Sequence, residues 1–256
     1  MRSRPFTSIF SISYYGARFK GWAVQPGQPT VQGKLEKVLR FVLGHEDFQI
    51  LGSSRTDAGV SCRSGFVQIF LREKVDLEAL LAEFNLHLGG EIRLNSVQEI
   101  HRDFNLIQAV KLKTYRYFFS DSESFHPFAS PFLTLVTGIS SIEQMQEKAS
   151  LFAGKHDFKA FCKVSGTKTD FVREVISAKV FESDTFSSEF SPVNTFCFEV
   201  TATGFLYHQV RKMIYAIWFF SPDEIKERLE NPAGQWDSVP TASANGLVLW
   251  ETDLNI

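Results

Sequence analysis

The sequence predicts an α+β fold: two pseudo-duplicated αβ halves forming a largely antiparallel sheet with helices on one face. Three observations support this prediction. Apolar residues alternate with polar ones in short segments, which is typical of half-buried strands. Capped amphipathic helices lie between these segments, and mixed elements at this spacing indicate α+β. The same order of elements occurs in both halves of the 256 residues, so we place the halves at residues 1–108 and 109–256.

In the first half, Phe10, Ile12 and Tyr14 alternate with serines and predict a strand. A loop with several Gly and Pro residues follows, over residues 15–29. Thr30 is placed to cap a helix with apolar residues at helical spacing, and Gly44 is placed to end it. We expect the remaining elements to be a strand over residues 65–71, a helix beginning near Asp76 and a strand over residues 97–100.

In the second half, residues 110–119 predict a strong strand. The segment from Ser140 to Glu143 has the pattern of a capping box, which predicts a helix reaching Gly154. A long helix is expected from about Phe205 to Phe220, and Ser221 then caps a short helix with Pro222 at its first position. The remaining strands are expected over residues 175–181, 196–202 and 246–250.

The charge of the chain is unevenly distributed. The net charge is −2, but residues 1–40 contain seven basic residues and one acid, whereas residues 181–256 contain four basic and eleven acidic residues. Charge asymmetry of this kind indicates an anionic partner, such as a nucleic acid, at the basic end. Uneven surface charge with no functional meaning explains it equally well, and charge alone does not decide between the two.

Several classes of protein are disfavoured. Cys62, Cys162 and Cys197 have neither metal-ligand spacing nor an even count, so we expect no disulfide framework and a reducing, cytoplasmic location. The longest apolar run, residues 213–220, is too short to span a bilayer, and no secretory signal is apparent. Phosphate-loop, dinucleotide and zinc motifs are missing, so we expect no nucleotide cofactor and no metal.

The most informative segment is Ser53–Val60, a polar turn that contains Gly59 and precedes a predicted strand. Arg55 is placed to pair with Asp57 or with a phosphate, and the small residues after Asp57 leave room for a bulky ligand. A surface carboxylate stabilised by an arginine is the simpler interpretation, because ion pairs are common in turns.

This segment resembles the signature R-T-D-A-G-V of TruA-type tRNA pseudouridine synthases. Seven further motifs of that family occur in the family's order along nearly the whole chain. They are Tyr14–Gln25 (similar to Y-D-G-x-x-F-x-G-W-Q-x-Q), Thr30–Gly33 (T-V-Q-G), His101–Asn105 (H-A-R-F-x), Lys113–Tyr117 (K-x-Y-R-Y), Gly154–Phe161 (G-x-H-D-F-x-x-F), Phe205–Met213 (F-L-x-H-x-V-R-x-M) and Ala242–Leu249 (A-P-x-x-G-L-x-L). One such motif is weak, but eight in order are specific, so the chain is identified as a divergent member of this family.

The resemblance implies that the protein isomerises uridine to pseudouridine in tRNA, in the family at positions 38–40 of the anticodon stem-loop. This reaction breaks the N–C glycosidic bond, turns the uracil and rejoins it through C5, without metal or redox cofactor. By the same resemblance, Asp57 is the catalytic carboxylate and Arg211 pairs with it. Tyr115 is implied to stack on the target base, which helps to offset the cost of flipping the uridine.

The resemblance also implies how RNA is bound. Arg55, Thr56 and His208 are expected to bind the substrate near the target nucleotide. Arg18, Lys20 and Arg116 are expected to contact phosphates, with a contribution that weakens in salt. Family members are homodimers that receive RNA in a cleft between the two halves, so we expect a homodimer, and we expect the acidic C-terminal region to face away from the RNA.

The chain departs from the family pattern at several positions. Tyr15 stands where the family usually has Asp, Ala23 where it has Gln, and Ser61 where it has His; Cys62, Ala216 and Ser243 also differ. None of these changes affects Asp57, Tyr115 or Arg211, so we interpret them as changes in substrate choice or efficiency. Two alternatives stay open: the same reaction on another tRNA position or another RNA, and a non-catalytic RNA-binding protein of this fold.

Overall fold

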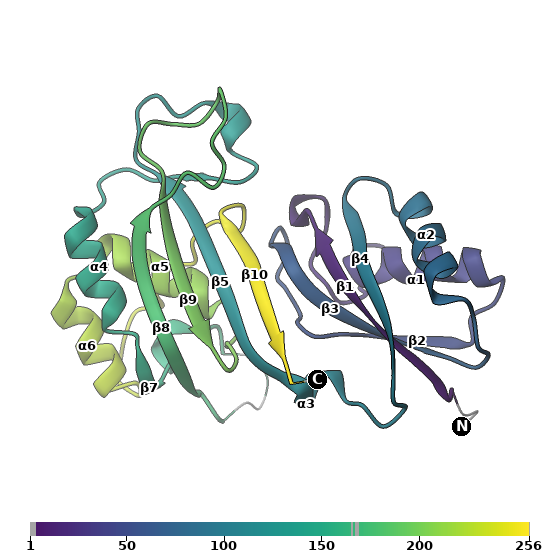
Figure 1. Ribbon diagram of the computed structural model, residues 1–256. Coiled ribbons are helices and arrows are strands. Elements are labelled where there is room, and N and C mark those ends of the chain that lie inside the picture. Colours follow the sequence, from purple (N-terminus) through teal and green to yellow (C-terminus); the bar gives the residue numbers. More distant parts are fainter. Residues whose placement is uncertain (1–3, 165, 167–168, 256) are drawn as a thin grey trace. The chain divides into compact units, whose positions relative to one another are not determined.

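The computed structural model describes residues 4–164, 166 and 169–255 (Figure 1). The chain divides into two compact units, one formed by Met1–Lys111 with Leu249–Ile256 and the other by Leu112–Val248. Each unit contains mostly antiparallel strands with helices packed on one face, which confirms the α+β class. The predicted boundary at residue 108 and the RNA-binding cleft between the halves stay predictions.

In the first unit, β1 (Phe6–Tyr14) pairs antiparallel with β3 (Ser61–Leu71) on one side and β4 (Ile92–Ile100) on the other. The short β2 (Phe48–Gly52) also pairs antiparallel with β3, and β10 (Leu247–Leu254) follows β3 in the strand order. Its helices are α1 (Val31–Leu43), α2 (Leu77–Leu88) and the short α3 (Leu106–Ala109), and a 3₁₀ turn, η1 (Gly16–Arg18), follows β1.

The caps of the first two helices are those that the sequence predicts. The Thr30 hydroxyl accepts a hydrogen bond from the Gly33 amide, and Gly44 ends α1 in the left-handed conformation, with φ of 72°. The Asp76 carboxylate accepts hydrogen bonds from the amides of Glu78 and Ala79 at the start of α2. These caps satisfy main-chain donors that a helix start would otherwise leave unpaired.

In the second unit, the strand order is β5 (Val110–Ser120), β9 (Phe196–Ala202), β8 (Val172–Glu182) and β7 (Gly154–Asp157), with every neighbouring pair antiparallel. The two-residue β6 (Thr134–Leu135) runs parallel to β5. The helices are α4 (Ile142–Ser150), α5 (Gln209–Phe219) and α6 (Pro222–Glu230), and the 3₁₀ turns are η2 (Pro127–Ala129) and η3 (Lys159–Phe161).

Two helix predictions in this unit are wrong at their ends. The cap of α4 is Ser141 rather than Ser140, and the helix ends at Ser150, so the chain from Gly154 forms β7 instead of helix. The Ser140 hydroxyl accepts a hydrogen bond of 2.6 Å from the Lys148 ammonium. The long helix α5 begins at Gln209, four residues after the predicted start, because His208 adopts a left-handed conformation that is not helical.

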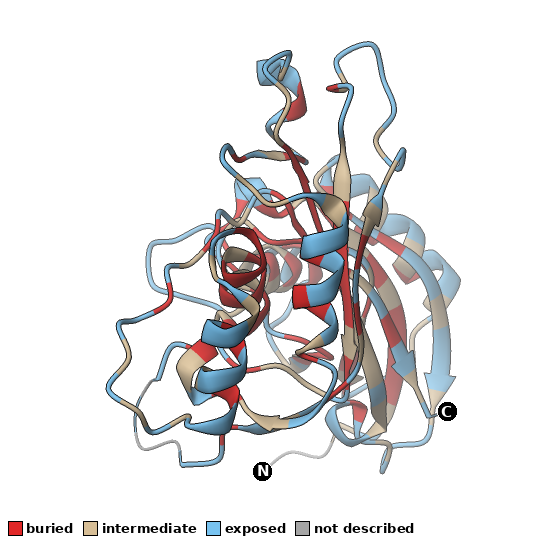
Figure 2. Cartoon of the chain, turned by 90° about the vertical axis from the view of Figure 1, so that its left-hand side faces the viewer, coloured by how far each residue is buried: buried red, intermediate tan, exposed pale blue. Residues whose placement is uncertain are grey.

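The core of the second unit lies between its sheet and its helices. Most residues of α5 are buried, whereas α4 and α6 expose their outer sides (Figure 2). Trp218 of α5 contacts Tyr117 and Phe119 of β5 edge to face, with ring centroids 5.5 and 5.2 Å apart. Residues 115, 117 and 119 share one face of β5, so α5 covers the face that carries Tyr115.

Among the described residues, no helix combines the length and the apolar character needed to cross a membrane.

The buried thiols predict how stability depends on pH. Burial raises the pKa of Cys62 and Cys197 from 9.0 to about 12. Both thiols keep their proton in the folded chain at a pH where the unfolded chain has lost it, so stability falls as pH rises above about 9. We expect the free energy of unfolding, measured with urea under reducing conditions, to be lower at about pH 10 than at pH 8 by roughly 1 kcal/mol per thiol.

The Cys62→Ala variant tests the origin of this pH dependence. It should unfold more easily at both pH values, because a buried group is lost, but the difference between them should shrink to about half. If the difference is the same in the wild type and in the Cys62→Ala/Cys197→Ala double variant, the buried thiols do not cause it.

Candidate active site

Asp57 lies on a loop, residues 53–60, that connects β2 to β3 and is anchored at both ends. At its start, the Ser53 amide donates to the Phe66 carbonyl at 2.9 Å, and the Ser53 hydroxyl accepts from the Phe66 amide at 3.1 Å. At its end, the Val60 amide donates to the Asp57 carbonyl at 3.2 Å. The Asp57 side chain is half-buried at the turn between these anchors, while Arg55 is exposed.

Thr56 points into the protein. Its side chain is buried, and its hydroxyl hydrogen-bonds to that of Tyr14 at 2.8 Å. Its carbonyl accepts a hydrogen bond of 3.1 Å from the Trp22 amide. Thr56 therefore positions the neighbouring Asp57, and the structure gives its hydroxyl a partner inside the protein.

A second loop, residues 15–22, packs against the Asp57 loop; we call it the clamp loop, and the contact between the two loops the clamp. The Gly59 amide donates to the Phe19 carbonyl at 3.2 Å, and Gly16 donates its amide to the Ser61 hydroxyl at 2.9 Å. The two main chains approach so closely that a Cβ on Gly16 would lie 2.0 Å from the Val60 carbonyl oxygen. Gly21 has φ of 97° and would place a Cβ 3.0 Å from the Thr56 carbonyl oxygen. Only glycine fits these two positions without a shift.

The start of α1 is hydrogen-bonded to the clamp loop. The amides of Val31 and Gln32 donate to the carbonyls of Gly21 and Trp22 at 3.1 and 3.0 Å. A helix start has free amides, and here they bind the clamp loop instead of water. Three of the sequence motifs, Tyr14–Gln25, Thr30–Gly33 and Arg55–Val60, thus form one connected unit that fixes the main chain beside Asp57.

The clamp loop also carries Arg18 and Lys20, and both side chains are exposed. Together with Arg55, they place three exposed cations on two loops that are hydrogen-bonded to each other. Ser61, which replaces the family's histidine, uses its hydroxyl to accept from the Gly16 amide. Ser61 is therefore part of the contact between the two loops.

Tyr115 lies on β5 of the second unit. Only 9% of its surface is exposed, and its ring contacts Phe205 edge to face at 5.2 Å. Tyr117, two residues further on the same face, is a core residue whose hydroxyl donates to the Ser243 carbonyl at 2.8 Å. Of the two tyrosines, Tyr117 is fully buried, and Tyr115 keeps some exposed surface.

The structure does not bring Arg116 to the face of Tyr115. Strand alternation turns it to the opposite face of the sheet, where its Nε lies 2.7 Å from a carboxylate oxygen of Glu199. Lys179 binds the other oxygen at 2.9 Å. Burial raises the pKa of Glu199, but the hydrogen bonds from Lys179 and Arg116 outweigh this effect and hold the pKa below its usual value. The phosphate contact of Arg116 stays a prediction.

Arg211 is held by the last of the sequence motifs. Its Nε donates to the Ala242 carbonyl at 2.7 Å, and the Ala242 amide donates back to the Arg211 carbonyl at 3.2 Å. His208, three residues earlier, directly precedes α5 in a left-handed conformation, and its ring packs on Tyr207 with centroids 4.0 Å apart. Ala242 therefore holds both the main chain and the guanidinium of Arg211.

Asp57 belongs to the first unit, and Tyr115 and Arg211 belong to the second. The pairing of Asp57 with Arg211 stays a prediction. The sequence motifs include the clamp residues Tyr14, Gly16 and Trp22, but sequence reasoning assigns them no role, because their contacts are between segments far apart in the chain.

Comparison with known proteins adds to this geometry. A family model described as tRNA pseudouridine synthase matches residues 149–254. The protein "tRNA pseudouridine synthase A 2" of Bacillus thuringiensis subsp. konkukian (strain 97-27) is 34% identical over 208 residues, which cover 81% of either chain. The protein "tRNA pseudouridine synthase A" of Brevibacillus brevis is 31% identical over 249 residues, which cover 94% of this chain and 96% of its own. The similarity therefore extends through both units.

Proposed function

Because the chain belongs to the tRNA pseudouridine synthase A family, we propose that it isomerises uridine to pseudouridine in tRNA, at positions 38–40 of the anticodon stem-loop. The observation that carries the proposal is the Asp57 loop. Its main chain is fixed at Ser53, Thr56, Gly59 and Val60, while the Asp57 carboxylate is half-buried at the turn. A catalytic group works best when its neighbours hold it in place before the substrate arrives.

The proposed reaction is an isomerisation whose atoms balance without a co-reactant. The bond between N1 of uracil and C1′ of ribose breaks, and a bond between C5 and C1′ forms. The C5 proton is lost, and N1 gains a proton. Asp57 supplies the carboxylate for these steps, as the nucleophile or as the base that removes the C5 proton.

Two residues of the second unit complete the proposed site. Arg211 pairs with the Asp57 carboxylate and supplies the positive charge that a carboxylate needs when the bound RNA excludes water. Tyr115 stacks on the turned-out uracil, for which its ring needs only one open face. The contact of Tyr115 with Phe205 and the bonds of Arg211 to Ala242 support these roles, since each contact fixes the orientation of the side chain before RNA binds.

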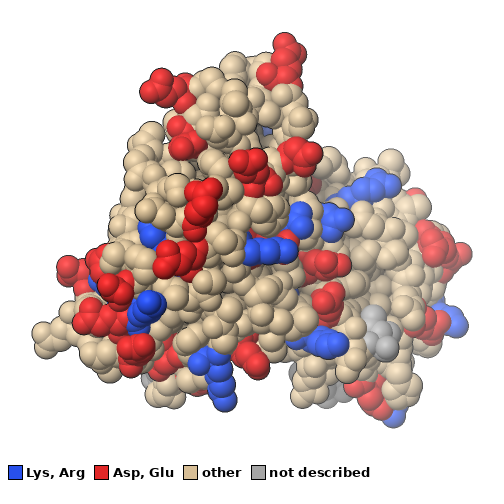
Figure 3. All heavy atoms as spheres, turned by 60° about the vertical axis from the view of Figure 1, so that its left-hand side comes forward, with Lys and Arg blue, Asp and Glu red and all other residues tan. Residues whose placement is uncertain are grey.

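The charge distribution supports binding of RNA to the clamp side of the first unit. Arg18, Lys20 and Arg55 are exposed there and are suited to contact phosphates. In the second unit, Asp and Glu side chains gather on the loops that follow β5 and β8, at the upper end of Figure 3. These loops repel a phosphate backbone, so we propose that they face away from the RNA.

We also propose that the protein is a homodimer and that it is located in the cytoplasm.

The proposal is tested with an unmodified tRNA transcript from the same organism. Pseudouridine is mapped after carbodiimide treatment by primer extension, and transcripts with cytidine at each of the three positions serve as controls. We expect stops at positions 38–40 that disappear with the corresponding cytidine. Stops elsewhere in the tRNA would contradict the position, and protein that binds tRNA without producing any stop would contradict the activity.

A further inference from the structure

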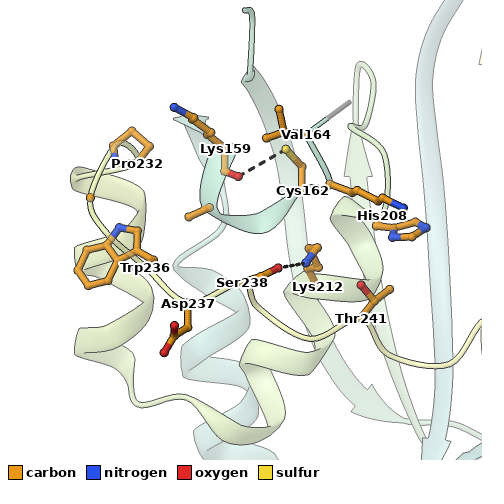
Figure 4. A pocket seen from close by; sticks show the side chains of 13 residues that line it. Lys159, Cys162, Val164, His208, Lys212, Pro232, Trp236, Asp237, Ser238 and Thr241 are labelled. Atoms are coloured by element: carbon orange, nitrogen blue, oxygen red, sulfur yellow. Dashed lines mark hydrogen bonds between the residues drawn. The ribbon is translucent and has the colours of Figure 1, made fainter. Parts of the chain in front are cut away.

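An open pocket of about 560 Å³ lies within the second unit, and His208 is the one residue of its lining to which the sequence resemblance assigns a role (Figure 4). Its walls come from η3 and the residues that follow it, from the start of α5, and from the segment after α6. Lys212 lies in the middle of the view, with Trp236 and Pro232 on one side and His208 on the other. The volume of the pocket is in the usual range for pockets that hold small ligands, so the pocket has room for one nucleotide.

The pocket is strongly cationic. Lys159, Lys163 and Lys212 line it together with a single acid, Asp237. Among the described residues, no carboxylate lies within 4.0 Å of any of these three ammonium groups. Most lysines on a protein surface are solvated, but three that line one pocket without a paired acid create a positive potential inside it.

Lys212 carries its charge into the protein interior. Its side chain is 4% exposed, and its ammonium donates to the Ser238 hydroxyl at 3.1 Å and to the Val239 carbonyl. Both acceptors are neutral. Burial and the nearby charge of Lys163 lower the pKa of Lys212, and together they outweigh the opposite effect of Cys162. A bound anion would offset both effects, because it compensates a charge that the protein itself leaves without a counter-ion.

The main chain beside this pocket is strained. Among the described residues, His208 is the one non-glycine residue with positive φ, at 63°. Such conformations cost energy and cluster at ligand sites, where the surrounding structure holds them. Here the Lys163 amide donates to the Tyr207 carbonyl at 2.9 Å, and the Lys163 ammonium lies 5.5 Å from the centre of the Tyr207 ring. The turn that strains His208 thus also fixes Lys163 at the pocket.

We propose that this pocket binds a backbone phosphate of the RNA substrate, outside the nucleotide that reacts. The inference rests on the proposed function, since a tRNA substrate offers a phosphate at every nucleotide and lysines bind phosphate as point charges. Lys159 and Lys163 are exposed and meet the phosphate first, and the buried Lys212 lies behind them. The pocket thereby adds an RNA contact in the second unit to those of Arg18, Lys20 and Arg55 in the first.

The test measures the affinity for the unmodified tRNA transcript by filter binding as a function of salt. Lys159→Gln/Lys163→Gln removes both exposed charges of the pocket. Lys155→Gln/Lys226→Gln, which removes two exposed lysines outside it, is the matched control. We expect the pocket variant to raise Kd by about fivefold at low salt and to make the slope of log K against log salt shallower by about one, while the control stays near the wild type.

The outcomes separate this proposal from the proposed function. If both double variants change Kd and slope equally, or if neither does, the pocket proposal is overturned, even where pseudouridine is still formed. If the pocket variant alone has a higher Kd and a shallower salt slope, but the wild type forms no pseudouridine in any transcript, the pocket proposal is supported and the proposed activity is contradicted.

Inorganic phosphate, added at constant ionic strength, is the second probe. If it raises the unfolding temperature of the wild type while the pocket variant binds tRNA normally, the pocket serves a free phosphate and the RNA assignment is overturned.

Discussion

Replacing Asp57 with Asn is expected to abolish pseudouridine formation, with a loss of at least about 10³-fold in the single-turnover rate. Asn has nearly the same shape as Asp but is neutral, so it neither attacks a carbon nor removes a proton. The loop should keep its conformation, because the substitution leaves the main-chain hydrogen bonds at Thr56, Gly59 and Val60 in place. Affinity for the tRNA transcript should therefore stay near that of the wild type.

Asp253→Asn is a matched control, since Asp253 is exposed on β10 in the same unit as Asp57. It removes one negative charge from the first unit without touching either loop, and its rate should equal that of the wild type. A variant Asp57→Asn that keeps a tenth or more of the wild-type rate would show that another group supplies the carboxylate. Loss of tRNA affinity in this variant would instead indicate that Asp57 acts in binding.

The predictions that succeeded rest on local signals. Thr30, Asp76 and Ser221 cap the helices that the sequence places after them, and the Ser221–Glu224 capping box is complete in the structure. The strand over residues 196–202 is found at the predicted positions. A cap or an alternating strand depends on neighbours within a few residues, so one sequence is enough to find it.

The predictions that failed depend on contacts between distant segments. Ser140 and Ser141 are adjacent, and Glu143 and Gln144 follow each of them at cap spacing, so local pattern does not choose between the two registers. In the structure, the Lys148 ammonium donates to the Ile217 carbonyl of α5 at 3.2 Å and to the Ser140 hydroxyl, so Ser140 is bonded to a residue that itself contacts a distant segment. The strands β2 and β7 were not predicted, because both are short and owe their conformation to pairing with β3 and β8.

In the candidate site, too, local signals were predictable and contacts between distant segments were not. The resemblance selects Asp57, Tyr115 and Arg211, and the structure finds each of them held by neighbours. Strand alternation alone would have predicted that Arg116 and Tyr115 face opposite ways, since they are adjacent on β5. The clamp around Asp57, in contrast, was not predictable from one sequence, because a sequence does not show what a Cβ on Gly16 would meet.

Replacing Gly16 with Ala is therefore expected to damage the site without touching a catalytic group. The added Cβ would lie 2.0 Å from the Val60 carbonyl oxygen and 2.7 Å from the Ser61 nitrogen, both main-chain atoms that have no rotamer to change. The main chain must shift instead, and overpacking of this kind typically costs about 1–3 kcal/mol in the free energy of unfolding. Because the displaced Val60 lies three residues after Asp57 and its amide bonds to the Asp57 carbonyl, we also expect the single-turnover rate to fall by about 10²-fold.

Gly90→Ala is the control, because Gly90 is in the same unit and a Cβ there meets nothing within 4 Å. Its unfolding free energy and its rate should stay close to those of the wild type. The comparison also separates two roles of the clamp. If Gly16→Ala lowers stability while folded molecules keep the wild-type rate, the clamp only stabilises the unit, and the position of Asp57 must be set elsewhere. If the rate falls in molecules that are fully folded at the assay temperature, the close contact of Gly16 with Val60 itself places the carboxylate.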